Sequence, residues 1–131
     1  MTQEERMLLI KDLSARLPYA VTVEHTSGFR GTLHDIAIHH MYDDNDNIYD
    51  AICYTDFFGD EDSIYIEYFK PYLFPLSSMT EEQKKEDYEI CKEYIIGYES
   101  NLIDFYNKYH LDYRGLIPKG LAIDATGLNV Y

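Results

Sequence analysis

Apolar residues recur at helical spacing soon after the start of the chain. Thr2 is followed three residues later by Glu5, which is the spacing of a capping box at a helix N-terminus. Pro18 ends the helical pattern, because proline disfavours helical backbone at the residue before it. We therefore predict an N-terminal helix that packs on a sheet through one apolar stripe, formed by Met7, Ile10, Leu13 and Leu17.

Alternation of apolar and polar residues replaces the helical spacing after Pro18. Residues 19–25 alternate regularly, which is typical of a half-buried strand. A turn at 26–28 and a second strand at 29–40 then complete a predicted hairpin. The residues that share the apolar face of the first strand are Tyr19, Val21 and Val23.

The second strand has an irregular pattern. Leu33 and Ile36 fall on opposite faces, so we expect a bulge near His34 and Asp35. A polar loop at 41–47 precedes two further strands, predicted at 48–57 and 63–69 with a turn at 58–62 between them. The apolar face of the last strand comprises Ile64, Ile66 and Tyr68.

An apolar connector follows at 70–82. Pro71 and Pro75 each remove a backbone donor, which argues against a central strand or a helix through this segment. We expect the connector to lie against the core with three side chains largely buried, those of Tyr72, Phe74 and Leu76.

Two helices are predicted after the connector. Thr80 and Gln83 have capping-box spacing, and Gly97 is placed to end the helix that they begin. Its expected buried stripe is Tyr88, Cys91 and Ile95. The next helix begins at Ser100 or Asn101 and carries Leu102, Phe105, Tyr106 and Tyr109. From Asp112 onward, glycines and Pro118 break the pattern, while Leu116, Ile117, Leu121 and Ile123 indicate a packed, irregular tail.

These elements predict an α+β fold in one domain, residues 1–131. An N-terminal helix is followed by an antiparallel sheet of about four strands and then by two C-terminal helices. The short, bent strands also fit a small SH3- or Sm-like barrel, which is the alternative architecture.

Two segments carry a family resemblance. They are 70–82, which reads KPYLFPLSSMTEE, and 112–117, which reads DYRGLI and is followed by Gly-Leu-Ala at 120–122. With LLIKDLSARLPY at 8–19, they resemble a family of small uncharacterised proteins of gut-bacterial genomes, often in prophage or mobile-element settings. The resemblance implies a bacterial accessory protein in an intracellular setting, and it transfers no catalytic or binding residue.

Negative charge is concentrated in one part of the chain. The formal net charge is −13, and ten acids but no Lys or Arg lie between Gly31 and Phe69. Such a field repels phosphate groups and anionic lipid, so direct nucleic-acid and membrane binding are disfavoured.

The cysteines and the N-terminus suggest a cytoplasmic location. Cys53 and Cys91 stand alone without metal-ligand or CxxC spacing, which is typical of reduced structural thiols. The first six residues are polar and acidic and do not resemble a signal peptide, and no stretch approaches the ~20 apolar residues of a membrane span.

A candidate interaction surface combines the acids with one later motif. Tyr113 and Arg114 qualify because an arginine stands alone among apolar neighbours, although Arg114 is equally suited to bind the last carbonyl groups of the third helix. The full candidate set is Asp43, Asp44, Asp46, Asp60, Glu61, Asp62, Tyr113 and Arg114.

Motifs for catalysis or cofactors do not emerge from the spacing. An EF-hand loop begun at Asp43 places Ile48 where glycine is needed and Tyr54 where a bidentate glutamate belongs. Neighbouring His39 and His40 point to opposite faces of a strand and so do not converge on one metal ion. The sequence contains no nucleophile elbow, dinucleotide fingerprint or phosphate-binding loop. We therefore predict no catalytic, metal or cofactor residues.

Three functions fit these patterns. The first is a non-enzymatic interaction module whose acids steer it to a basic protein partner and whose tyrosines anchor it. The second is a DNA mimic, because Asp44 with Asp46 and Asp60 with Asp62 have a spacing close to that of phosphate charges. The third is a small hydrolase with an unrecognised site.

Overall fold

The computed structural model describes residues 1–42, 45, 48–56, 61–92 and 98–131. Within them the helices are α1 (Gln3–Arg16), α2 (Glu81–Lys92) and α3 (Tyr98–Lys108), with 3₁₀ turns η1 (Leu17–Tyr19), η2 (Ile66–Tyr68) and η3 (Leu76–Ser78). The strands are β1 (Thr22–His25), β2 (Arg30–Tyr42), β3 (Ile48–Asp56), β4 (Glu61–Tyr65), β5 (Phe69–Leu73) and β6 (Ile123–Asp124).

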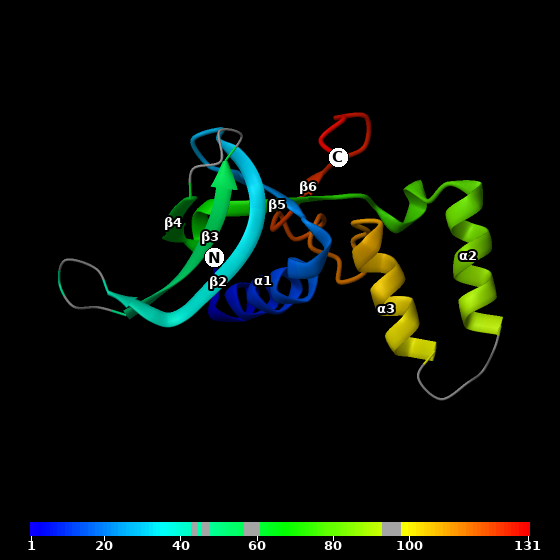
Figure 1. Ribbon diagram of the computed structural model, residues 1–131, viewed down its shortest axis with the longest axis horizontal. Coiled ribbons are helices and arrows are strands. Elements are labelled where there is room, and N and C mark those ends of the chain that lie inside the picture. Colours follow the sequence, from blue (N-terminus) through cyan, green and yellow to red (C-terminus); the bar gives the residue numbers. More distant parts are fainter. Residues whose placement is uncertain (43–44, 46–47, 57–60, 93–97) are drawn as a thin grey trace.

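The predicted α+β class is confirmed. The described strands form one sheet in the order β4-β3-β2-β1-β5-β6, in which β5 and β6 are parallel and the other neighbours antiparallel. The sheet runs from β4 to β6 without closing, so the barrel alternative is unconfirmed. Helices α2 and α3 stand side by side at the end of the molecule away from β3 and β4 (Figure 1).

Helix α1 begins at the predicted capping box but buries a different face. The Thr2 hydroxyl accepts the Glu5 N–H at 3.1 Å, and the Glu5 carboxylate accepts the Thr2 N–H at 2.9 Å. Met7 is 55% exposed, so its place in the stripe was wrong. The buried residues are Leu9, Ile10, Asp12, Leu13 and Arg16. The buried face of α1 therefore differs from the predicted apolar stripe and includes Asp12 and Arg16, whose charges are paired inside the protein.

The first hairpin forms largely as predicted. Val21 and Val23 are fully buried, whereas Tyr19 ends the η1 turn and is separated from β1 by Ala20, which has a positive φ of 54°. The register of β2 against β3 shifts between Leu33 and Asp35, which confirms the bulge. Strand β2 continues to Tyr42, two residues beyond the prediction, and shifts again between Ala37 and Met41.

The predicted strand at 63–69 divides in two. Strand β4 ends at Tyr65, and the η2 turn redirects the chain so that Ile66 is buried while Tyr68 is 44% exposed. The prediction that Ile66 and Tyr68 share a strand face was therefore wrong. A 3₁₀ helix has three residues per turn, so two residues such as Ile66 and Tyr68, which are two positions apart, do not point to the same side as they would in a strand.

The connector contains a strand that the prolines argued against. Strand β5 pairs with β1, with Pro71 opposite Val23. On its other side, β5 pairs with β6 only at Tyr72 and Leu73, after the proline. The N–H that Pro71 lacks is therefore not needed for hydrogen bonding to β6. Tyr72 is buried as predicted, whereas Phe74 is only partly buried and Leu76 is 38% exposed. Leu76 was therefore misassigned, because it lies in the η3 turn after the strand.

Helix α2 starts at the predicted cap but has no buried residue. The Thr80 hydroxyl accepts the Gln83 N–H at 3.1 Å, and the Gln83 side chain accepts the Thr80 N–H at 2.9 Å. Tyr88 is 65% exposed, so the predicted stripe was wrong there; Ile95 and Gly97 lie outside the described residues. The helix packs on α3, with a polar contact in which the Tyr109 hydroxyl donates to Glu86 at 2.8 Å.

Helix α3 and the tail complete the core. Helix α3 begins at Tyr98, two residues before the prediction, and buries Phe105. The tail is packed as expected, because Leu116 and Leu121 join the main apolar cluster. That cluster comprises Leu9, Ile10, Leu13, Val21, Val23, Leu33, Ile66, Phe69, Leu73, Leu116, Leu121 and Ala122.

Leu13 provides a test of the core. It is fully buried in the main cluster, so Leu13→Ala is expected to lower the free energy of unfolding by about 2–5 kcal/mol through lost burial and a residual cavity. Met7→Ala on the exposed face is the matched control and should change it by less than about 0.5 kcal/mol. Urea denaturation of both variants measures the difference. Equal effects would mean that α1 is rotated relative to this structure.

Candidate functional site

The structure places the candidate residues in separate regions. Glu61 and Asp62 begin β4, the end strand of the sheet, opposite Thr55 and Tyr54 of β3. The other four acids, Asp43, Asp44, Asp46 and Asp60, lie outside the described residues, and so does most of the charge spacing that favoured a DNA mimic. Tyr113 and Arg114 lie in the tail after α3; both contact residues of α1, and the Tyr113 ring also stacks on Tyr106 of α3.

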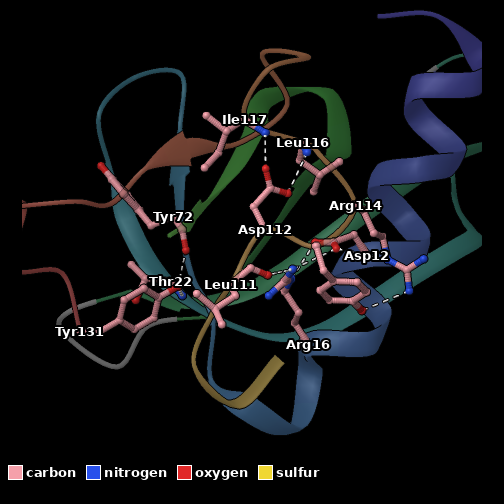
Figure 2. A network of polar contacts seen from close by, with 11 residues as sticks. Asp12, Arg16, Thr22, Tyr72, Leu111, Asp112, Arg114, Leu116, Ile117 and Tyr131 are labelled. Carbon is pink, nitrogen blue, oxygen red and sulfur yellow. Dashed lines mark hydrogen bonds and ion pairs between the residues drawn. The ribbon is translucent and has the colours of Figure 1, made fainter. Parts of the chain in front are cut away.

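A buried ion pair within α1 lies at the centre of the polar contacts around Tyr113 and Arg114 (Figure 2). Asp12 and Arg16 are both fully buried one helical turn apart. The Arg16 Nε donates to Asp12 Oδ2 at 2.7 Å, and its Nη2 donates to Asp12 Oδ1 at 3.1 Å. The same Nη2 donates to the Leu111 carbonyl at 2.8 Å. The first helix is thereby joined to the segment that follows α3.

Tyr113 and Arg114 extend this network. Arg114 Nε lies 3.4 Å from Asp12 Oδ1, so two guanidinium groups share one carboxylate. The Tyr113 ring lies 5.2 Å from the Arg16 guanidinium carbon and 4.9 Å from that of Arg114, within cation–π range. The expectation that Arg114 binds the carbonyl groups at the end of the third helix was wrong, since its guanidinium pairs with Asp12 and donates to the Tyr113 hydroxyl at 3.2 Å.

Asp112 explains the rest of the DYRGLI motif. Its carboxylate accepts two backbone N–H groups, from Leu116 at 2.8 Å and from Ile117 at 2.9 Å. Gly115 supplies a positive φ of 72° that this tight loop requires. The motif therefore folds the tail so that Leu116 enters the core, which is a structural use of residues that the sequence alone left without a role.

Tyr131 makes a second set of contacts between parts of the chain that are distant in sequence. Its hydroxyl donates to the Tyr72 carbonyl at 2.6 Å and accepts the Thr22 N–H at 3.1 Å. Its ring stacks on His110 with centroids 3.7 Å apart and planes 9° apart. Sequence reasoning missed this arrangement, because nothing in the local pattern relates residues so far apart along the chain.

Among the cavities lined by described residues, two are large enough for a small ligand. The first, about 330 Å³, lies at the β1–β2 turn and is lined by Glu24, His25, Thr26, Gly28, Tyr68, Lys70 and Ile123. The second, about 310 Å³, lies where α2 begins and α3 ends. Its lining residues are Phe74, Ser78, Thr80, Gln83, Lys108, Tyr109, His110, Leu111 and Tyr131. The first mixes both signs of charge, whereas the second has four aromatic rings and one charged residue, Lys108, in its lining.

His110 has an unusual environment in the second cavity. Its Nδ1 is buried and has no hydrogen-bond partner among the described residues. Burial, and next the nearby Arg16 charge, lower the pKa of His110 from 6.5 to about 4. The ring is therefore neutral at pH 7 and contributes an aromatic surface to the cavity rather than a positive charge.

No protein-family model, curated protein or solved structure matches this chain. The resemblance to gut-bacterial mobile-element proteins thus stays a prediction. Within the described ranges, no helix is long and apolar enough to cross a membrane. The same part of the chain holds no group of three or more His, Cys, Asp or Glu side chains placed to hold a metal ion.

The Asp12–Arg16 pair generates a stability prediction. Arg16→Met leaves the Asp12 carboxylate buried with only the longer Arg114 contact, and should lower the free energy of unfolding by about 3–5 kcal/mol. Lys11→Met, on the exposed face of the same helix, should cost less than about 0.5 kcal/mol. Chemical denaturation measures both variants. A cost for Arg16→Met as small as the control's would show that the network contributes nothing to folding.

His110 generates a pH prediction. The unfolded chain takes up a proton near pH 6.5, whereas the folded chain does so only near pH 4. The free energy of unfolding should therefore fall as the pH drops through this window, by about 1–3 kcal/mol once partial solvent access to the ring is allowed for. His110→Asn suits the positive φ of 56° and removes this contribution. Urea midpoints at pH 7 and 4.5 test it, and identical pH slopes for both proteins would contradict it.

Proposed function

We propose that this protein is a non-enzymatic binding module for a basic protein partner. The observation that carries the proposal is the position of β4, an end strand of the sheet whose first residues are Glu61 and Asp62. This strand lies within the 31–69 segment that holds ten acids and no Lys or Arg. The end strand of the described sheet therefore belongs to the most acidic segment of the chain.

The edge of β4 offers main-chain hydrogen bonds to an added strand. One side of β4 pairs with β3, and no described strand pairs with its other side, whose N–H and C=O groups could bond an added strand. Glu61 and Asp62 favour a strand rich in Lys or Arg. They also disfavour pairing with the same strand of a second copy, because like charges would then meet across the new ladder.

Tyrosines near the end of β4 supply an apolar anchor. Tyr65, the last residue of β4, makes an edge contact with Tyr68 at a centroid distance of 5.8 Å. Tyr68 is 44% exposed, and Phe29 at the neighbouring β1–β2 turn is 66% exposed. Exposed aromatic side chains are enriched at protein interfaces, where they form anchors surrounded by a polar rim.

The test uses a fluorescent peptide of alternating lysine and valine as the basic strand. Glu61→Gln with Asp62→Asn should weaken binding by about 2- to 30-fold and flatten its salt dependence, since two steering charges are lost. Fluorescence anisotropy at several salt concentrations measures this effect. Amide exchange should also slow, when the peptide binds, at those residues of 61–65 whose N–H groups point away from β3, because these N–H groups become paired.

Glu81→Gln with Glu82→Gln is the control. It removes the same charge from an exposed part of α2 and should leave peptide affinity nearly unchanged. Equal losses for the two double variants, or no slowing of exchange along β4, would contradict docking at this edge and leave the acids a role in overall charge alone.

A further inference from the structure

The cavity between α2 and α3 has the size and walls of a small-ligand site. Its volume of about 310 Å³ lies at the lower end of the range for ligand pockets. It is lined by the start of α2, the end of α3, Phe74 after β5, and Tyr131. Four separate parts of the chain therefore converge on it, and two of them, α2 and α3, lie at the end of the molecule away from β4 (Figure 1).

The walls are flat aromatic surfaces held in place by contacts of their own. His110 stacks on Tyr131, and Phe74 lies 5.9 Å from the same ring at 45°. Tyr109 is held by an edge contact with Phe105 at 5.1 Å and by its hydroxyl bond to Glu86. Rings held in this way give the cavity aromatic walls, against which a planar ligand ring can pack through stacking and edge contacts.

Two side chains in the lining keep free donors, whereas three hydroxyl oxygens there can only accept. Lys108 is the one charged residue among the described lining residues, and it makes no ion pair with a described residue; its ammonium lies 5.0 Å from the Tyr109 ring centroid. Gln83 uses its oxygen on the Thr80 N–H, which leaves its NH₂ group as a donor. The hydroxyl groups of Ser78, Tyr109 and Tyr131 already donate to Pro75, Glu86 and Tyr72.

We propose that this cavity binds a small aromatic carboxylate. The ring packs among Phe74, Tyr109, His110 and Tyr131, and the carboxylate meets the Lys108 ammonium and the Gln83 amide. His110 is neutral at pH 7 and so adds to the aromatic wall without repelling or attracting the anion. The site is separate from the β4 edge and does not depend on the interaction proposed there.

Binding would also act on α2. This helix has no buried residue of its own, and the cavity joins its first turn to α3 and to the end of β5. A ligand in the cavity adds contacts across that junction, so amide exchange in α2 should slow as the site fills.

The experiment compares three probes by amide NMR titration at pH 7. Benzoate has both ring and charge, benzyl alcohol has the ring alone, and acetate has the charge alone. Benzoate is expected to shift the resonances of Gln83, Lys108, Tyr109 and His110 in a saturable manner, with benzyl alcohol weaker and acetate without a saturable effect. A net charge of −13 gives anions no general affinity for this protein, so saturation by benzoate would report a specific site.

Matched variants locate the charge and the ring contacts. Lys108→Met should weaken benzoate about 2- to 5-fold and leave benzyl alcohol unchanged, whereas Lys119→Met, on an exposed lysine of the tail, should alter neither. Tyr109→Leu should weaken both aromatic probes. The amide spectrum of each variant shows whether it has folded.

Three results would overturn the proposal. One is the absence of saturable shifts at these residues with benzoate up to about 20 mM, well above a millimolar dissociation constant. Another is acetate binding as tightly as benzoate, which would remove the aromatic requirement. The third is an equal loss of affinity in Lys108→Met and Lys119→Met, which would reduce the effect to net charge.

Discussion

The buried Arg16 guanidinium is the group on which the arrangement of this protein depends. Burying an ion pair removes both charges from water, and the cost is offset only when the remaining donors and acceptors are satisfied. Here Asp12 accepts two bonds from Arg16 and the Leu111 carbonyl accepts a third, while Arg16 Nη1 is buried without a hydrogen-bond partner among the described residues. Because Leu111 lies 95 residues from Arg16, one side chain fixes both the buried face of α1 and the start of the tail. Arg114 and Tyr113 then close over it.

The two ends of the molecule have different chemistry. At one end β4 is the last described strand of the sheet and begins with two acids, and at the other the α2–α3 cavity combines aromatic walls with donors from Lys108 and Gln83. The apolar core between α1, the sheet and the tail separates them, so each surface can serve a ligand without requiring the other.

Features set by neighbours in the chain were predictable from the sequence. The capping boxes at Thr2 and Thr80 form as their spacing indicates, because the atoms that bond lie three residues apart. The bulge between Leu33 and Asp35 follows from a break in alternation on a single strand. The mixed class follows from the order of helical and strand-like periods. Of the candidate surface, the sequence determined the acidic character of the β4 region, because charge is a property of composition.

Features decided by distant contacts were not predictable. Met7 and Tyr88 are apolar in character yet exposed, and Asp12 and Arg16 are charged yet buried, since pairing within the fold outweighs the preference of each residue alone. Pro71 lies within a strand because β6 joins β5 beyond it. The aromatic cavity needs residues from the end of β5, from α2, from α3 and from the end of the tail, and no local pattern relates them. The sequence determined which residues carry charge and aromatic surface, and the tertiary structure decided which of them meet.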